Sequence, residues 1–161
     1  MILFDLDGTL VDTAHDLAYA LNLQRQQHGL TTLPFEAIRP YASHGSKGVV
    51  TNKPRRFTQP LLENIGLLNR AKSVVCADDA ARPKPYPDSL YLACEQAGVS
   101  PDICWYVGDA ERDIEAGRAA GMYTVVAMYG YLGATDNPQA WGADVAIDTP
   151  LELLNLIHDA N

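Results

Sequence analysis

The stretch Met1-Ile-Leu-Phe-Asp-Leu-Asp-Gly-Thr-Leu-Val-Asp12 decides the fold, because a short apolar run leads directly into two carboxylates. Residues 2–4 predict a buried β-strand, and the Gly-Thr pair predicts a turn behind it. Asp5 and Asp7 repel one another and lose hydration at the end of a core strand, so a cation or a substrate must compensate their charge. A solvated turn whose acids only cap the next helix remains the alternative at this point.

The whole chain has the size and composition of one globular domain, with 161 residues, 47% apolar and 20% charged. No apolar run approaches the roughly 18 residues of a membrane span, and no signal segment is recognised, so we expect a cytoplasmic protein without a membrane partner. The net charge of −8 argues against nucleic acid as a partner. The widely spaced Cys76, Cys94 and Cys104 predict reduced thiols in the core.

Short apolar runs alternate with helical segments along most of the chain. Strands are predicted at residues 2–4, 49–50, 73–76, 104–107, 123–128 and 145–147, and helices at 13–28, 34–41, 54–65, 87–97, 111–120 and 150–158. This alternation predicts an α/β fold, a doubly wound parallel sheet covered by helices on both faces.

Polar side chains follow the predicted strands, at the edge where a parallel sheet binds its ligands. We expect six of them to converge there: Asp5, Asp7, Thr51, Lys84, Asp109 and Asp113. Carboxylate oxygens are the ligands that Mg²⁺ prefers, and the four histidines show no metal-ligand spacing. A lysine and a hydroxyl suit the oxygens of a phosphoryl group, which a carboxylate can accept as an aspartyl-phosphate. The pattern therefore predicts Mg²⁺ and a small phosphorylated substrate.

Four segments resemble the motifs of the haloacid dehalogenase superfamily, in their order and at strand ends. They are Asp5-Leu-Asp-Gly-Thr-Leu-Val-Asp12, Thr51 in Val-Thr-Asn-Lys, Lys84 in Lys-Pro-Tyr-Pro, and Gly108-Asp-Ala-Glu-Arg-Asp113. The resemblance covers the opening twelve residues and nearly the whole chain after residue 48, and it implies a Rossmann-like core. Within the superfamily, the chain is most similar to phosphoglycolate phosphatases and to the related N-acetylmuramic acid 6-phosphate phosphatases.

The resemblance also implies a role for each motif residue. Asp5 would accept the phosphoryl group, and Asp7 would protonate the leaving alkoxide and then activate water. The backbone carbonyl of Asp7 and the carboxylates of Asp5 and Asp109 would hold Mg²⁺. Asp113 would be a further ligand or would orient the site. The threonine and the lysine of the second and third motifs would bind phosphoryl oxygens.

The interval between the first two motifs departs from the superfamily, whose members of this type carry a helical cap there. Such a cap of about four helices needs on the order of 60 residues. The interval at 13–48 is much shorter and predicts two helices, with no crossover helix in front of residue 49. We therefore expect a core of residues 1–12 and 49–161, a remnant of the cap at 13–48, and missing residues between about 42 and 49.

Several functions stay open at this level. The first is a Mg²⁺-dependent phosphatase of the phosphoglycolate phosphatase type, as a monomer or homodimer. The alternatives are an N-acetylmuramic acid 6-phosphate phosphatase, a sugar phosphomutase and an inactive phosphate-binding domain that lacks its cap. Other conspicuous residues are expected to be structural: Arg55, Arg56, Asp78 and Asp79 as solvated charges, and Tyr129, Tyr131 and Trp141 as packing groups.

Overall fold

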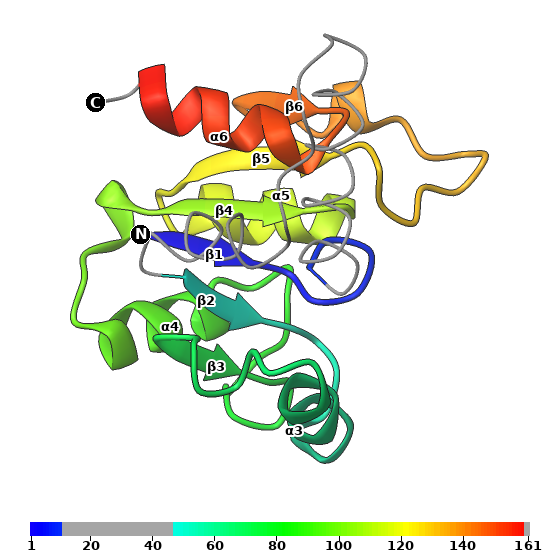
Figure 1. Cartoon of the computed structure of the whole chain (residues 1–161). Helices are drawn as coiled ribbons and strands as arrows, with labels where there is room; N and C mark the ends of the chain where they lie inside the picture. The colour runs from blue at the N-terminus through cyan, green and yellow to red at the C-terminus, as the bar shows by residue number, and fades with distance from the viewer. Residues whose placement is uncertain (11–46, 160–161) are drawn as a thin grey trace, which may run out of the picture.

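The computed structural model of the chain describes residues 1–10 and 47–159 (Figure 1). Its strands are β1 (Ile2–Phe4), β2 (Lys47–Val50), β3 (Ser73–Val75), β4 (Trp105–Gly108), β5 (Tyr123–Ala127) and β6 (Val145–Ile147). Its α-helices are α3 (Arg55–Asn64), α4 (Asp88–Ala97), α5 (Glu111–Ala119) and α6 (Pro150–Asp159), and short 3₁₀ turns occur at Pro101–Ile103 and Pro138–Ala140. The helices expected at 13–28 and 34–41 lie outside this part of the chain, as does the expected cap remnant except for its last two residues, which belong to β2.

The strands form one parallel sheet in the order β3-β2-β1-β4-β5-β6, which confirms the predicted fold class (Figure 1). After β1 the chain adds β2 and β3 on one side, and then returns to place β4, β5 and β6 on the other side. This reversal leaves a crevice at the carboxyl ends of β1 and β4, which is where an open α/β sheet binds its ligands.

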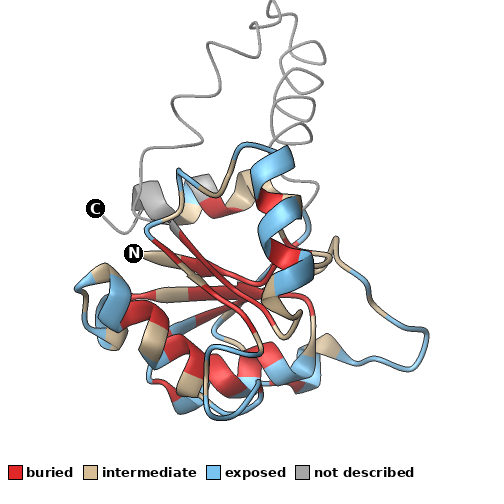
Figure 2. Cartoon of the chain, turned by 90° about the horizontal axis from the view of Figure 1, so that it is seen from below, coloured by how far each residue is buried: buried red, intermediate tan, exposed pale blue. Residues whose placement is uncertain are grey.

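Helices cover both faces of this sheet (Figure 2). On one face, buried side chains of α4 and α5 pack on Leu3, Val50 and Tyr106. On the other face, α6 packs on a cluster that includes Phe4, and α3 packs beside Val49. Neighbouring residues of one strand therefore point to opposite cores, as the pleat of a β-strand requires.

Strand β2 begins at Lys47, two residues before the expected start at residue 49. The prediction began at the first apolar residue, whereas the pairing of Gly48 with Leu3 and Ser73 depends on the neighbouring strands. A Cβ at Gly48 would lie 2.4 Å from the Ser73 hydroxyl, so the close approach explains the glycine inside the strand.

The expectation for the cysteines is confirmed. Cys76, Cys94 and Cys104 are buried free thiols, as predicted. Helix α4 ends at Gly98, which has a φ of +67°, a backbone conformation that favours glycine. Within residues 1–10 and 47–159, no helix is both long enough and apolar enough to cross a membrane.

Candidate active site

The carboxyl edge of the sheet fixes the first residues of the site through its own backbone. The N–H of Asp5 donates to the Val107 carbonyl at 2.9 Å, and the N–H of Thr51 donates to the Val75 carbonyl at 2.9 Å. The hydrogen-bond ladder thus continues one residue beyond β1 and β2. Both side chains therefore start from backbone positions that neighbouring strands hold in place.

Three carboxylates gather at this edge. Asp5 follows β1, Asp109 follows β4, and Asp113 lies in the first turn of α5. Their exposed fractions are 4%, 4% and 0%, and an oxygen of each lies within 4.8 Å of an oxygen of the other two. Buried charges of one sign at this spacing repel one another and lose hydration, so the arrangement requires cations.

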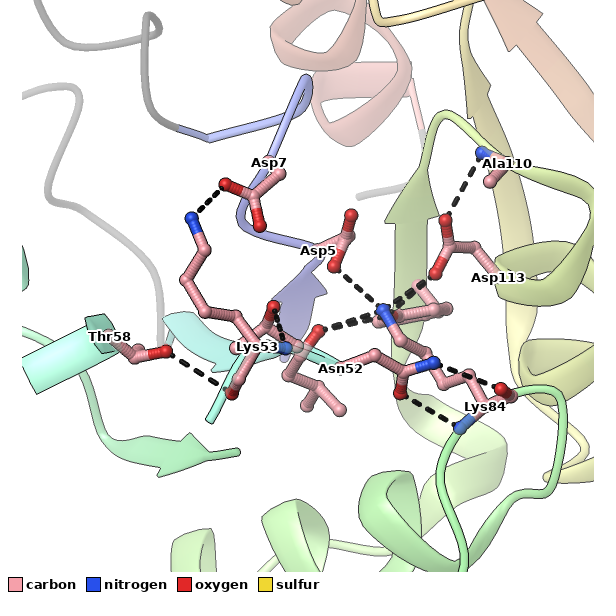
Figure 3. Close-up of polar contacts among 11 residues, drawn as sticks. Asp5, Asp7, Asn52, Lys53, Thr58, Lys84, Ala110 and Asp113 are labelled. Carbon is pink, nitrogen blue, oxygen red and sulfur yellow. Dashed lines mark hydrogen bonds and ion pairs between the residues drawn. The ribbon is translucent and has the colours of Figure 1, made fainter. Parts of the chain in front are cut away.

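Lys84 supplies one of these cations, from the loop between β3 and α4 (Figure 3). Its Nζ lies 2.7 Å from Asp5 Oδ1 and 2.7 Å from Asp113 Oδ1, and the lysine is 3% exposed. The structure therefore brings together four of the six predicted site residues: Asp5, Lys84, Asp109 and Asp113.

One ammonium group does not balance three buried carboxylates. Burial raises the pKa of Asp5 from 3.8 to about 6, although Lys84 lowers it, and Asp113 raises it further. Burial likewise raises the pKa of Asp109, where the Tyr131 N–H has the opposite effect. Part of the negative charge of the carboxylates therefore remains uncompensated. Their hard oxygen atoms fit a divalent cation such as Mg²⁺.

A buried tyrosine completes the surroundings of Lys84. The hydroxyl of Tyr106 on β4 lies 2.8 Å from Lys84 Nζ and 3.1 Å from the carbonyl oxygen of Val50. The three N–H groups of Lys84 can therefore reach Asp5, Asp113 and the tyrosine oxygen, while the tyrosine donates to Val50. Asn52 holds the lysine backbone with two bonds of 3.0 Å, one to its N–H and one to its carbonyl.

Glycines allow Asp109 to enter this crowded edge. Its Oδ2 accepts a hydrogen bond of 2.6 Å from the N–H of Tyr131. A Cβ at Gly8 would lie 2.0 Å from that same oxygen, and a Cβ at Gly130 would lie 2.2 Å from the Asp109 Cβ. The loops after β1 and β5 therefore approach Asp109 so closely that only glycine, which has no Cβ, fits at these two positions.

Asp113 is fixed on both of its oxygens. Oδ2 accepts a hydrogen bond of 3.1 Å from the N–H of Ala110, directly before α5. Oδ1 contacts Lys84, as described above. A Cβ at Gly108 would lie 2.3 Å from the Asp113 Cβ, so the glycine at the end of β4 provides room for this side chain.

Asp7 and Thr51 lie beside the buried carboxylates without a described hydrogen bond to them. The Asp7 carboxylate pairs with Lys53, at 2.5 Å between Oδ1 and Nζ. Thr51 is 2% exposed, and its hydroxyl accepts a hydrogen bond of 3.1 Å from the N–H of Lys53. The structure thus joins these two predicted residues through a third one that the prediction did not include.

A cleft of about 280 Å³ opens in front of Asp7 and Asp109. It is also lined by Ala110, Glu111, Arg112, Tyr131, Asp136 and Trp141. The packing expectation is wrong for Tyr131, which is 73% exposed and borders the cleft. Trp141 borders it too but is buried against Ile114, so for this residue the expectation holds.

The side chain of Arg55 is 37% exposed, as expected of a solvated charge, but it also has fixed partners. Its side chain forms an ion pair with Asp79, and its N–H donates to the Asp78 carboxylate at 2.9 Å. Asp79 also accepts a hydrogen bond of 2.7 Å from the N–H of Cys76. The guanidinium hydrogen bond lowers the pKa of Asp79. This network ties the start of α3 to the loop behind β3, from which Lys84 comes.

Sequence reasoning missed four residues of the site: Asn52, Lys53, Tyr106 and Tyr131. Asn52 and Lys53 follow Thr51 directly, so their place behind a strand end was a usable signal. In the sequence, Tyr106 looks like an ordinary apolar residue of a strand. Its hydroxyl reaches the site because β4 pairs with β1, which the sequence pattern alone does not indicate. Tyr131 contributes a backbone N–H to Asp109, which no side-chain pattern reveals.

Two curated relatives align with almost the whole chain. An N-acetylmuramic acid 6-phosphate phosphatase of Pseudomonas aeruginosa is 33% identical, over 99% of this chain and 95% of that protein. A phosphoglycolate phosphatase of Xanthomonas campestris is 32% identical, over 94% of this chain and 93% of that protein. The alignment with the Pseudomonas protein spans 214 positions against 161 residues here, so an internal part of that relative has no counterpart in this chain.

Solved structures share the fold. The crystal structure of a predicted phosphoglycolate phosphatase from Haemophilus somnus superposes with a TM-score of 0.70 at 20% identity, over 98% of this chain and 97% of that one. The sequence model of the haloacid dehalogenase-like hydrolases matches residues 41–127. These matches confirm the resemblance that the four motifs carry. The chain belongs to the haloacid dehalogenase-like hydrolase family.

Proposed function

We propose that the protein is a Mg²⁺-dependent phosphatase that hydrolyses a small phosphorylated metabolite of the cytoplasm through an aspartyl-phosphate. The observation that carries the proposal is the contact of 2.7 Å between the Lys84 ammonium and Asp5, next to two further buried carboxylates. Asp5 provides a fixed nucleophile, and the Lys84 ammonium provides a contact for the phosphoryl group. The carboxylates whose charge the lysine does not compensate provide ligands for a metal ion.

In the first step, an Asp5 oxygen attacks the phosphorus atom, and the bond from phosphorus to the ester oxygen breaks. Asp7 gives its proton to the departing alkoxide. In the second step, Asp7 takes a proton from water, and the resulting hydroxide attacks the aspartyl-phosphate and releases phosphate. Lys84 and Thr51 bind phosphoryl oxygens throughout, so the lysine exchanges part of its contact with Asp5 for a contact with substrate.

The carboxylates of Asp5 and Asp109 and the backbone carbonyl of Asp7 would hold Mg²⁺, which offsets the negative charge of the phosphoryl group when bound. Both oxygens of Asp113 already have partners, one in Ala110 and one in Lys84. This arrangement favours the second of the two roles considered for Asp113, the orientation of the lysine and of the site.

The substrate is a small phosphate ester, and the curated relatives suggest two candidates. The first candidate is phosphoglycolate, from the name of the Xanthomonas relative. The second is N-acetylmuramic acid 6-phosphate, from the name of the Pseudomonas relative. Phosphate release from both esters and from p-nitrophenyl phosphate tests the proposal with purified protein and Mg²⁺. We expect release from at least one ester and its loss with a chelator or in Asp5→Asn.

A matched control is Asp102→Asn, because Asp102 is exposed and lies before β4, at the opposite edge of the sheet. This variant should keep wild-type activity. Undiminished turnover in Asp5→Asn would contradict the aspartyl-phosphate, and isomerised sugar phosphate without free phosphate would indicate the mutase instead.

We further propose that residues 1–12 and 49–161 form the catalytic core, together with Lys47 and Gly48 at the start of β2, and that the residues from 13 up to this strand replace a longer cap. The internal part of the Pseudomonas relative without a counterpart here supports a shortened chain. It also favours a second candidate function, a phosphate-binding domain with weak turnover, since a reduced cap excludes water poorly. Intact-mass measurement of the purified protein decides whether residues are missing, because 17.5 kDa is the mass of these 161 residues.

A further inference from the structure

Lys53 contacts two groups of the proposed mechanism at the same time. Its ammonium lies 2.5 Å from Asp7 Oδ1, and its backbone N–H donates to the Thr51 hydroxyl at 3.1 Å. The lysine thus connects the end of β2 with the loop behind β1. The mechanism described above assigns it no task.

The backbone of Lys53 is held from two further sides. Its carbonyl accepts a hydrogen bond of 3.3 Å from the N–H of Ala77 and one of 3.3 Å from the hydroxyl of Thr58, which is fully buried. Since β2 and α3 fix the backbone on either side, the lysine side chain extends from a rigid base toward Asp7 (Figure 3).

Stability alone does not explain the ion pair. The side chains of Lys53 and Asp7 are 31% and 42% exposed, and solvent-exposed ion pairs contribute little to the free energy of folding. What the contact determines is orientation. One carboxylate oxygen of Asp7 meets the lysine, while the other lies on the side toward Asp5 (Figure 3).

We propose that Lys53 is a positioning residue, which holds the Asp7 carboxylate so that its second oxygen faces the ester oxygen of the substrate. The inference rests on the proposed phosphatase function. During phosphoryl transfer, the bond from Asp5 to phosphorus forms, the bond to the ester oxygen breaks, and the proton moves from Asp7 to that oxygen. Lys53 transfers no proton and contacts no reacting atom.

The test uses two esters that differ in their need for this proton. The alkoxide of phosphoglycolate leaves only with a proton, whereas p-nitrophenolate is stable as an anion. We expect Lys53→Met to lower kcat/KM for phosphoglycolate by about tenfold or more, since general acids contribute about 10²–10⁴-fold. For p-nitrophenyl phosphate the loss should stay below about threefold. The variant keeps the backbone N–H to Thr51.

Two further variants complete the experiment. Lys53→Arg restores a cation next to Asp7 and should recover most of the lost phosphoglycolate activity. Lys72→Met makes the same change at an exposed lysine before β3, at the opposite edge of the sheet, and should behave as wild type.

Each outcome has a distinct meaning. The positioning role is overturned if Lys53→Met lowers kcat/KM equally for both esters, leaves it unchanged, or raises it. In each of these cases the phosphatase function still stands. If wild-type protein hydrolyses neither ester, the proposed function fails, and the inference about Lys53 fails with it.

Discussion

Lys84 and Asp5 stand 79 residues apart in the chain, yet the lysine Nζ lies 2.7 Å from Asp5 Oδ1. The two residues come from different segments, a loop behind β3 and the end of β1. A buried ion loses its hydration, and here the lysine compensates the charge of Asp5, while Asp5 and Asp113 together compensate the charge of the lysine. Their contact therefore links the stability of the fold directly to the presence of the site.

Removal of the lysine should affect stability and activity together. In Lys84→Met, Asp5 and Asp113 lose their buried cation, and breaking such a pair costs about 3–5 kcal/mol. We expect a correspondingly lower free energy of unfolding in urea and a loss of turnover of about 10²-fold or more. Lys72→Met serves as the control, and equal urea midpoints for the two variants would contradict the prediction.

The hydroxyl of Tyr106 should contribute through Lys84. Tyr106→Phe removes one acceptor from the ammonium and one donor from the Val50 carbonyl, at a cost of about 1–3 kcal/mol. We expect a drop in thermal stability and a several-fold decrease of kcat, because the lysine loses one of its fixed contacts. In the control Tyr91→Phe, an exposed hydroxyl that donates to Ala119 is lost, and kcat should not change.

The stability of the metal-free protein should depend on pH through Asp5. Its pKa is raised from 3.8 to about 6 in the fold, so the folded state binds more protons than the unfolded state between these values. The contribution of Asp5 to stability is thus full below pH 3.8 and decreases as the pH rises through about 6, by roughly 3 kcal/mol in total. Asp109, whose pKa is also raised, acts in the same direction.

Urea unfolding with a chelator at several pH values between 4 and 7 measures this effect. We expect Asp5→Asn to become more stable relative to wild type as the pH rises, because the amide stays neutral. Added Mg²⁺ should reduce the difference. A constant difference between the two proteins over this range would show that Asp5 has an ordinary pKa.

Gly8 should be intolerant of a side chain for two separable reasons. Its φ of +79° disfavours other residues by about 1–2 kcal/mol, and a Cβ would also lie 2.0 Å from Asp109 Oδ2. Gly66→Ala isolates the first effect, since Gly66 has a φ of +69° and no atom within 4 Å of its Cβ position. We expect Gly8→Ala to be the less stable variant and to weaken Mg²⁺ binding in calorimetry, which Gly66→Ala should leave unchanged.

The carboxylates of the site were predictable because they obey a general rule. Asp5, Asp109 and Asp113 follow apolar runs, and the ends of parallel strands meet at one edge. Lys84 between prolines carried no such signal, and only its place in the order of the four motifs indicated its role. The strand alternation predicted the sheet for a similar reason, since each short apolar run has a clear boundary.

The contacts between segments were not predictable from local patterns. The pair of Asp7 with Lys53 depends on the distance between the loop behind β1 and the end of β2, which adjacent strands determine. Arg55 was expected in solvent because a charged residue at a helix start usually lies there, and its exposed side chain is also paired with Asp79 from the loop behind β3, which no local pattern indicates. Such partners are set by the packing of whole elements.

The central place of β1 has a consequence for the order in which the protein can fold. Ile2 pairs with Trp105, so the first strand gains its neighbour on that side only after most of the chain has been synthesised. Contacts of such large sequence separation slow folding, since a long loop must close before they form. Asp5, the proposed nucleophile, therefore meets Asp109 and Asp113 only late in synthesis, and a nascent chain that ends before β4 carries Asp5 without them.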